Sequence, residues 1–237
     1  MAMSTERPSQ GNVPLNSAGL LRLMQMVSPA LPVGAFAYSH GLEWAVSAGW
    51  VNTAAQAEAW VGGLLRHVWA RLDVPGLGRI LAALQAGDLA RVAHWSERLQ
   101  AGRESAELRA EDRLMGQALA RLLADLGVSR AAEWVSDPRC SFPVPWACAA
   151  AHWQIPAQPA GLGLLWTYAE HQVAAAVKLV PLGQTAGQRM LQRLIELIPP
   201  AVEEGLRLPD ADIGGIAPAL GIASARHETQ YTRLFRS

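Results

Sequence analysis

The chain has 237 residues, 51% of them hydrophobic, and a formal net charge of zero from 20 basic and 20 acidic residues. This length and apolar content permit a substantial core and argue against disorder over most of the chain. A general nucleic-acid binder needs a clustered basic surplus, so the balanced charge argues against that class. The two cysteines, Cys140 and Cys148, are too few for a disulfide framework and fit a reducing compartment.

The first residues and the longest uncharged stretch bear on targeting. Residues 1–14 are polar and contain no apolar central run, so they predict a flexible extension and not a signal peptide. The uncharged stretch from Cys140 to Ala169 is interrupted by prolines and glycines, whereas a membrane-spanning helix needs about 20 continuous apolar residues. We therefore expect a soluble, cytoplasmic protein without a membrane segment.

Apolar residues recur at helical spacing along most of the chain. Thr53 with Gln56 predicts a capping box at the start of the first strong stripe, and Asp88 predicts another helix start. Gly127 marks one helix end, and the prolines at 199–200 are expected to stop another. In chain order, the predicted helices cover 53–72, 88–98, 119–126, 164–180 and 190–198.

The domain organisation follows from the same pattern. No run of alternating polar and apolar residues and no Asn-Gly or Asp-Gly turn predicts a hairpin. The break at 183–187 shows no change in composition, so it is not a domain boundary. We predict an all-α protein: the extension 1–14, one globular domain of roughly eight to ten helices over 15–223, and a C-terminal partner-binding tail over 224–237.

Known nucleotide-binding patterns are missing from the sequence. A phosphate-binding loop places its lysine directly after a glycine-rich turn, but Lys178 follows Ala-Ala-Ala-Val. Gly-Leu-Gly at 76–78 lacks both the third glycine and a preceding strand. We therefore do not expect the chain to hydrolyse nucleotides or to bind a dinucleotide.

Three small groupings leave an enzyme or a metal-binding protein as the alternative. Ser39, in Ala-Tyr-Ser-His-Gly, resembles a relaxed nucleophile elbow, but a helix-capping role suits it better. Glu170 and His171 are an acid and a base inside an apolar helix, although adjacent helical residues point about 100° apart. Cys148 and His152 share a helix face, yet two ligands do not make a metal site.

The segments near the two ends of the chain give a more specific indication of function. Leu31 to Glu43 reads Leu-Pro-Val-Gly-Ala-Phe-Ala-Tyr-Ser-His-Gly-Leu-Glu, with Gly-Trp-Val at 49–51, and His227 to Ser237 reads His-Glu-Thr-Gln-Tyr-Thr-Arg-Leu-Phe-Arg-Ser. Turn formers, aromatics and charges suit a recognition surface, and Arg and Tyr are enriched among interface hot spots. Both segments resemble the corresponding ends of the urease accessory protein UreF family.

The resemblance implies an all-α, non-enzymatic assembly factor without a cofactor. Such a protein dimerises and binds the accessory protein UreD, called UreH in some bacteria. The pair recruits the GTPase UreG and acts on apo-urease for nickel insertion. The tail arginines could act as a finger on the GTPase, or they could serve docking. The partner-binding residues that the resemblance implies are Phe36, Tyr38, His40, Glu43, Arg226, His227, Tyr231, Arg233 and Phe235.

The composition and residue spacing also give expectations for self-association, order of the tail and nickel binding. An apolar chain of zero net charge is expected to associate, and a two-fold homodimer is the commonest closed form. The tail from Arg226 to Ser237 has few apolar anchors of its own, so we expect it to be poorly ordered until a partner covers it. No three ligands can be placed at helical spacing, so we expect no tight nickel site.

Overall fold

The computed structural model describes residues 15–237, so the expected extension over 1–14 lies outside the described residues. This part of the chain is helical and contains no strand. None of its helices has the length and apolar character needed to cross a bilayer. The helices are α1 (Ser17–Met26), α2 (Leu42–Ser47), α3 (Ala54–Leu64), α4 (Asp73–Ala86), α5 (Leu89–Ala101), α6 (Ala106–Asp125), α7 (Ser129–Ala132), α8 (Pro143–His152), α9 (Ala157–Leu179), α10 (Gln184–Ile195), α11 (Ile198–Arg207) and α12 (Pro218–His227).

The prediction of an all-α domain is confirmed. Ten of the described α-helices have ten residues or more, whereas α2 has six and α7 has four. Two predicted helix starts also have the expected caps. The Thr53 hydroxyl accepts a hydrogen bond from the Gln56 N–H at 3.2 Å, and the Asp88 carboxylate accepts one from the Arg91 N–H at 2.9 Å.

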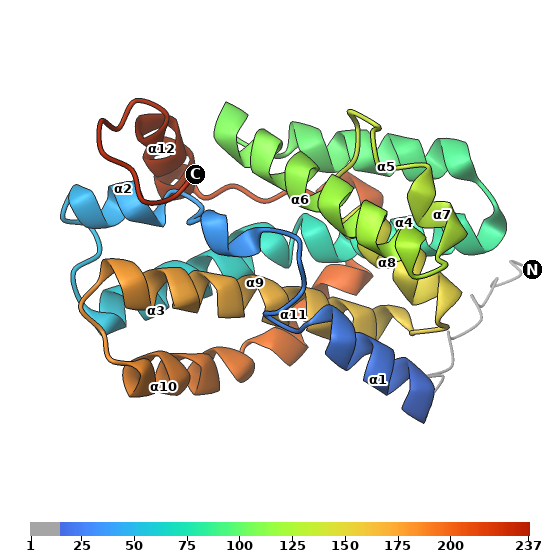
Figure 1. The fold of residues 1–237 in the computed structure, drawn as a ribbon, viewed down its shortest axis with the longest axis horizontal. Helices are drawn as coiled ribbons and strands as arrows, with labels where there is room; N and C mark the ends of the chain where they lie inside the picture. Colours follow the sequence, from blue (N-terminus) through green and yellow to red (C-terminus); the bar gives the residue numbers. More distant parts are fainter. Residues whose placement is uncertain (1–14) are drawn as a thin grey trace, which may run out of the picture.

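Helix α9 is the centre of the bundle. It runs through the middle of the molecule, with α5 and α6 on one side and α10 on the other (Figure 1), and it packs against α1, α3, α4, α8, α10 and α11. Small residues let its neighbours approach closely. At Gly163 a Cβ atom would lie 2.6 Å from Leu23 of α1 and 3.2 Å from Trp146 of α8.

Two predicted boundaries are wrong. The prolines at 199–200 do not stop a helix; they occupy the first turn of α11, where a missing N–H costs no helical hydrogen bond. The apolar stripe over 53–72 is not one α-helix either. After Leu64 the chain forms a π-helix, Leu65–Trp69, and then turns before α4 begins at Asp73.

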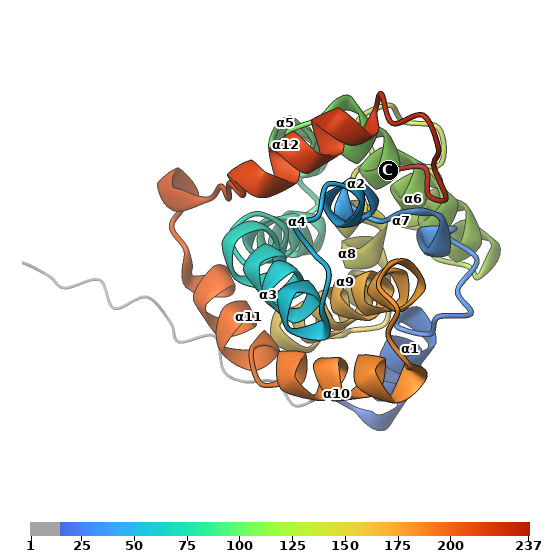
Figure 2. The same cartoon turned by 90° about the vertical axis from the view of Figure 1, so that its left-hand side faces the viewer.

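The boundary predicted between residues 223 and 224 lies inside α12, which continues to His227. The remaining segment, residues 228–237, is called the tail below. The tail does not extend away from the body, as a loosely held tail would. It returns to α2 and α6 beside α12 (Figure 2), and Phe235 and Ser237 are buried. No local feature of the sequence predicts this docking, because the groups that receive the tail lie on distant helices.

The π-helix packs closely against two glycines. A Cβ atom on Gly205 of α11 would lie 2.3 Å from the Ala70 carbonyl oxygen, and one on Gly215 would lie 2.3 Å from the His67 carbonyl oxygen. Distances this short to backbone atoms cannot be relieved by rotating a side chain. The packing of α11 on this part of the chain therefore requires glycine.

We predict that Gly205→Ala lowers the free energy of unfolding by roughly 1–3 kcal/mol, because the added methyl group overpacks the contact with Ala70. Urea denaturation followed by circular dichroism measures the change. Gly63→Ala in α3 is the matched control: no atom lies within 4 Å of the new methyl group, so helix propensity alone should stabilise the protein by about 1 kcal/mol. Equal effects of the two substitutions would contradict the packing argument.

Candidate functional site

The loop before α2 turns sharply against α12. His40 (φ 52°) and Gly41 (φ 70°) are successive residues in the left-handed region. Histidine is one of the few non-glycine residues enriched there. Gly41 is also required by packing, because a Cβ atom would lie 2.9 Å from the backbone nitrogen of Ser224 in α12. The turn therefore sets the start of α2 beside the C-terminal helix.

Glu43, in the first turn of α2, receives the tail. Its carboxylate accepts the N–H of Leu234 at 2.6 Å and the N–H of Phe235 at 2.8 Å. The Nε2 atom of His227, at the end of α12, lies 3.2 Å from the same carboxylate. Glu43 is 7% exposed, and a carboxylate so far from water needs hydrogen-bond donors. The tail backbone supplies two of them.

Glu107, on α6, binds both the end of α12 and the tail. The Nδ1 atom of His227 lies 2.7 Å from one of its oxygens, and the Arg233 guanidinium lies 2.7 Å from the other. The His227 ring is fully buried between Glu43 and Glu107. Each ring nitrogen therefore faces a carboxylate.

Glu111, one helical turn further along α6, joins the chain end to the loop. It accepts the Ser237 hydroxyl at 2.5 Å and pairs with Nδ1 of His40 at 2.8 Å. The Ser237 carbonyl in turn accepts the N–H and the hydroxyl of Ser39, at 2.7 and 2.5 Å. Burial of the imidazole opposes its protonation, but the Glu111 charge and hydrogen bond outweigh this and raise the pKa of His40.

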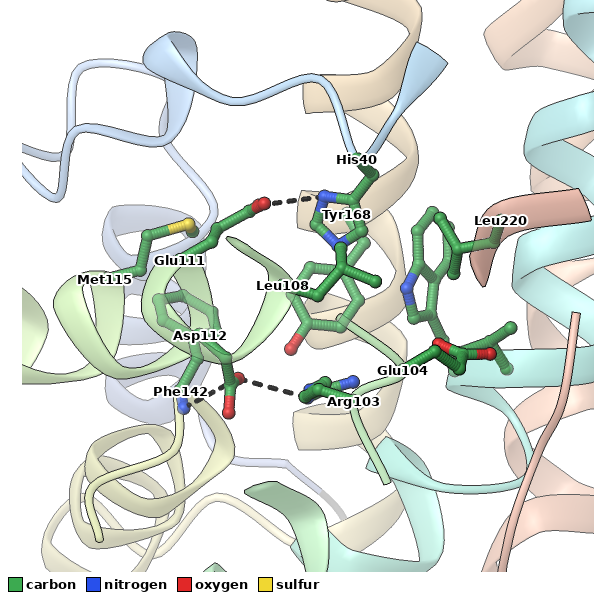
Figure 3. Close-up of a pocket in the computed structure, with 12 residues that line it drawn as sticks. His40, Arg103, Glu104, Leu108, Glu111, Asp112, Met115, Phe142, Tyr168 and Leu220 are labelled. Carbon is green, nitrogen blue, oxygen red and sulfur yellow. Dashed lines mark hydrogen bonds and ion pairs between the residues drawn. The ribbon is translucent and has the colours of Figure 1, made fainter. Parts of the chain in front are cut away.

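A buried ion cluster lies beneath His40 and anchors α6. The Arg103 guanidinium binds Asp73 of α4 at 2.5 and 3.0 Å and Asp112 of α6 at 3.0 Å, and Figure 3 shows it beneath the His40–Glu111 pair. The Tyr168 hydroxyl of α9 donates to Asp73 at 3.2 Å. Burial opposes the Arg103 charge, yet Asp112 and Asp73 raise its pKa well above the ordinary value. For Asp112, burial is the larger influence and raises the pKa.

A set of exposed residues lies around the docked tail. Tyr231 is fully exposed, Phe36 is 75% exposed and Leu234 is 68% exposed, although all three are large and apolar. Arg226 and Arg236 are also exposed. We call Phe36, Tyr231 and Leu234 the exposed patch residues.

The structure brings the two predicted end segments together. Residues 34–43 and the tail share direct hydrogen bonds, for example between Glu43 and Phe235. The nine predicted residues fall into two groups. Phe36, Arg226, Tyr231 and Arg233 are exposed, whereas Tyr38, His40, Glu43, His227 and Phe235 are buried or half-buried. Members of the second group support the surface from inside.

Glu107 and Glu111, which receive the tail on α6, were not predicted. They lie four residues apart, so they share a helix face. Neither has a basic residue four positions later: the residue four positions after Glu107 is Glu111, and the residue four positions after Glu111 is Met115. Two acids on one face with no basic residue three or four positions later were the available signal that their partners lie elsewhere in the chain.

The catalytic alternative for Ser39 finds little support. Ser39 is fully buried. Its hydroxyl donates to the Ser237 carbonyl and accepts the N–H of Glu43 at 3.3 Å. The predicted capping position is nevertheless wrong, because α2 begins at Leu42 and its N-cap residue is Gly41. These contacts make Ser39 a tether between the loop and the chain end.

Glu170 and His171 lie close together but form a weak pair. Their nearest oxygen and nitrogen atoms are 3.8 Å apart. Burial raises the pKa of Glu170, and burial also lowers the pKa of His171 to about 4. His171 is therefore neutral near pH 7, and both residues line a pocket beside Tyr38 and Phe235.

Cys148 and His152 line one pocket on α8, as their spacing predicted. Burial raises the pKa of the Cys148 thiol to about 12, so the thiolate needed for metal binding is scarce at neutral pH. Within residues 15–237, no three His, Cys, Asp or Glu side chains converge in a way that could ligate a metal ion.

We predict that nickel titrated calorimetrically into the purified chain shows no one-to-one site of submicromolar affinity. The reason is that a tight nickel site needs several convergent, deprotonated ligands, and the Cys148 thiol is protonated. A one-to-one site abolished by Cys148→Ala or His152→Ala would contradict this prediction.

Two half-buried histidines, His40 and His171, give a prediction for pH. Because the pKa of folded His171 is depressed to about 4, its contribution to stability is complete above pH 6.5 and declines as the pH falls. Between pH 7.5 and 5 this loss should reach roughly 2 kcal/mol, at 1.36 kcal/mol per pH unit below 6.5. His171→Gln should therefore lose less stability than the parent over this range in urea unfolding.

His40→Asn is the companion variant, since asparagine tolerates the left-handed backbone. The raised pKa of His40 makes its contribution complete below pH 6.5 and lost as the pH rises through the folded value. This variant should therefore be weakened more at pH 6 than at pH 9, opposite to His171→Gln. Parallel pH profiles for the two variants would contradict the assignments.

Comparison with known proteins identifies the family of this chain. The UreF family model matches residues 51–195. "Urease accessory protein UreF" of Alkalilimnicola ehrlichii is 51% identical over 216 residues, covering 91% of this chain and 95% of the relative. The protein of the same name from Azoarcus sp. strain BH72 is 50% identical over 99% of this chain and 100% of the relative. "Urease accessory protein UreF 2" of Brucella anthropi is 49% identical over 95% and 100%. The chain therefore belongs to the UreF family of urease accessory proteins.

Proposed function

We propose that this protein is a non-catalytic scaffold for nickel insertion into apo-urease. In this role it binds the accessory protein UreD, or UreH, and together they recruit the GTPase UreG. The observation that supports the proposal most directly is the set of exposed patch residues on and beside the docked tail. Large apolar side chains that remain in water beside an ordered backbone are typical of a surface that another protein covers.

The surroundings of the patch indicate what kind of partner surface fits. Arg226 and Arg236 are exposed near it, and the Lys178 ammonium lies 5.7 Å from the centre of the Phe235 ring. We infer a partner surface with an apolar centre and acidic groups around it. Complementary charges of this kind add specificity and speed to association.

Docking suits Arg233 better than a finger role on the GTPase. Its guanidinium is bound to Glu107, so reaching a nucleotide would require breaking that ion pair. This protein would then modulate UreG by setting the position in which the GTPase is bound, and not by contacting its nucleotide. Arg226 and Arg236 remain available to contact a partner.

The location, oligomeric state and class of partner are proposed from the composition and charge of the chain. We infer a cytoplasmic protein that acts as a two-fold homodimer, with protein partners and neither nucleic acid nor a membrane among its targets. Nickel is the cargo of the assembly and not a resident cofactor of this chain. The balanced charge and apolar composition support these inferences.

We predict that Tyr231→Ala weakens capture of UreD about 30-fold, because loss of an aromatic hot spot costs about 2 kcal/mol. Its side chain is fully exposed, so the melting temperature should stay unchanged. Co-purification and binding titration with UreD, then with UreG added, measure the effect. Leu126→Ala, at the opposite end of α6 from Glu107, is an exposed control that should bind normally.

Single substitutions are preferable to deleting the tail. Deletion would expose the site of Phe235 and remove the tail donors that Glu43, Glu107 and Glu111 bind. A truncated chain could therefore fail for structural reasons. If Tyr231→Ala captures UreD as well as the parent does and still supports urease activation, the proposed binding surface is wrong.

A further inference from the structure

Glu43 contacts both ends of one short loop. Residues 228–233 leave α12 at His227 and return to the body at Leu234. The His227 ring lies 3.2 Å from Glu43, and the N–H groups of Leu234 and Phe235 lie 2.6 and 2.8 Å from the same carboxylate. A single buried side chain therefore closes the base of the loop that carries Tyr231.

At the first residue of the loop, the Glu228 carboxylate accepts the N–H groups of Ala106 and Glu107 at the start of α6, at 3.1 and 3.4 Å. Beyond this residue the contacts within the loop are few and mostly local. Gln230 donates to the Thr232 carbonyl at 2.9 Å, and the Thr229 hydroxyl donates to the Arg226 carbonyl at 3.3 Å. Tyr231 contributes no burial, because its side chain is fully exposed. The loop conformation therefore depends on how its two ends are fixed.

Glu228 fixes the loop where it leaves α12, but the other attachments of the tail fix its return at Leu234 less directly than Glu43 does. The Arg233–Glu107 ion pair is partly exposed, with 39% of the arginine side chain in solvent, and ion pairs of this kind contribute little. Ser237 is bound to Ser39 and Glu111 at the far end of the tail, beyond the loop. The two consecutive amides bound by Glu43 adjoin the loop and are charge-assisted, which makes their hydrogen bonds stronger than neutral ones.

We propose that Glu43 is the positioning residue for partner recognition: its carboxylate closes the 228–233 loop and thereby sets where Tyr231 is presented. Glu43 itself is buried beneath the tail and acts through the tail. A partner that requires the closed loop binds with an affinity reduced by the fraction of open molecules. Loop closure is a property of the chain alone, whereas the effect on capture rests on the proposed function.

The test begins with Glu43→Gln, which keeps the shape of the side chain but replaces one acceptor oxygen by a donor group. Hydrogen–deuterium exchange on the purified full chain should show the amides of Leu234 and Phe235 exchanging at least ten-fold faster, with α9 unchanged. Glu196→Gln, an exposed carboxylate at the end of α10, is the matched control and should leave tail exchange at the parent rate.

A second pair of variants tests the same contact without altering Glu43. Leu234→Pro removes the N–H that Glu43 binds, whereas Leu234→Ala keeps that N–H and removes only an exposed side chain. We expect Leu234→Pro to accelerate exchange at Phe235 and Leu234→Ala to leave it unchanged. This comparison remains informative if Glu43→Gln does not fold.

Capture of UreD provides the readout that a purely structural role would not change in this way. If Glu43 acts through Tyr231, then Glu43→Gln should weaken capture at least ten-fold. The total loss of affinity in the double variant with Tyr231→Ala should then be much smaller than the product of the two separate losses. Full multiplicative losses in the double variant would overturn the positioning role.

The exchange and capture results separate the two proposals. Unchanged exchange at Leu234 and Phe235 in Glu43→Gln, together with unchanged exchange at Phe235 in Leu234→Pro, would overturn loop closure by Glu43, whatever happens to capture. Faster exchange together with undiminished capture in every variant, including Tyr231→Ala, would leave loop closure standing and overturn the proposed binding surface.

Discussion

The arrangement of the site depends on carboxylates that are removed from water and therefore need hydrogen-bond donors. Glu43, Glu107 and Glu111 have only 9%, 15% and 3% of their side chains exposed. Desolvated carboxylates are costly unless donors surround them. The tail backbone, its terminal serine and two histidines provide those donors, so the end of the chain completes the interior of the protein.

The position of these acids depends in turn on how α6 is fixed in the bundle. Arg103 joins Asp73 of α4 to Asp112 of α6, and the backbone N–H of Phe142, just before α8, binds Asp112 at 3.1 Å. Asp112 directly follows Glu111 in the sequence. The buried ion cluster and the tail site are therefore two faces of one helix, and a shift in the cluster would move the groups that receive the tail.

This organisation explains why buried and exposed residues of the end segments belong to one site. Phe36 and Tyr231 contact only solvent on their outer sides, whereas Glu43 and His227 lie underneath. Binding surfaces are more effective when supporting contacts fix their conformation before the partner arrives, because less freedom is then lost on association. A chain end attached at several points suits this requirement better than a free one.

Much of the secondary structure was predictable because its determinants are local. The caps at Thr53 and Asp88 lie within three residues of the groups they bind, and local hydrogen bonds leave a clear trace in the sequence. The prolines at 199–200 were misread because the same pair that ends one helix also suits the first turn of the next. The π-helix after Leu64 left no trace, since its residues keep an ordinary apolar spacing.

The sequence by itself determined the helical class, the approximate positions of α3, α5, α6, α9 and α10, and the two end segments that carry the family resemblance. Only the tertiary structure decided that these segments meet, that Glu107 and Glu111 receive the tail, and that Glu43 closes the loop before Leu234. The physical reason is distance along the chain. Glu43 and His227 are 184 residues apart, and Arg233 and Glu107 are 126 apart. Such contacts require the packed arrangement of the helices, and a local pattern of residues does not specify which distant group is the partner.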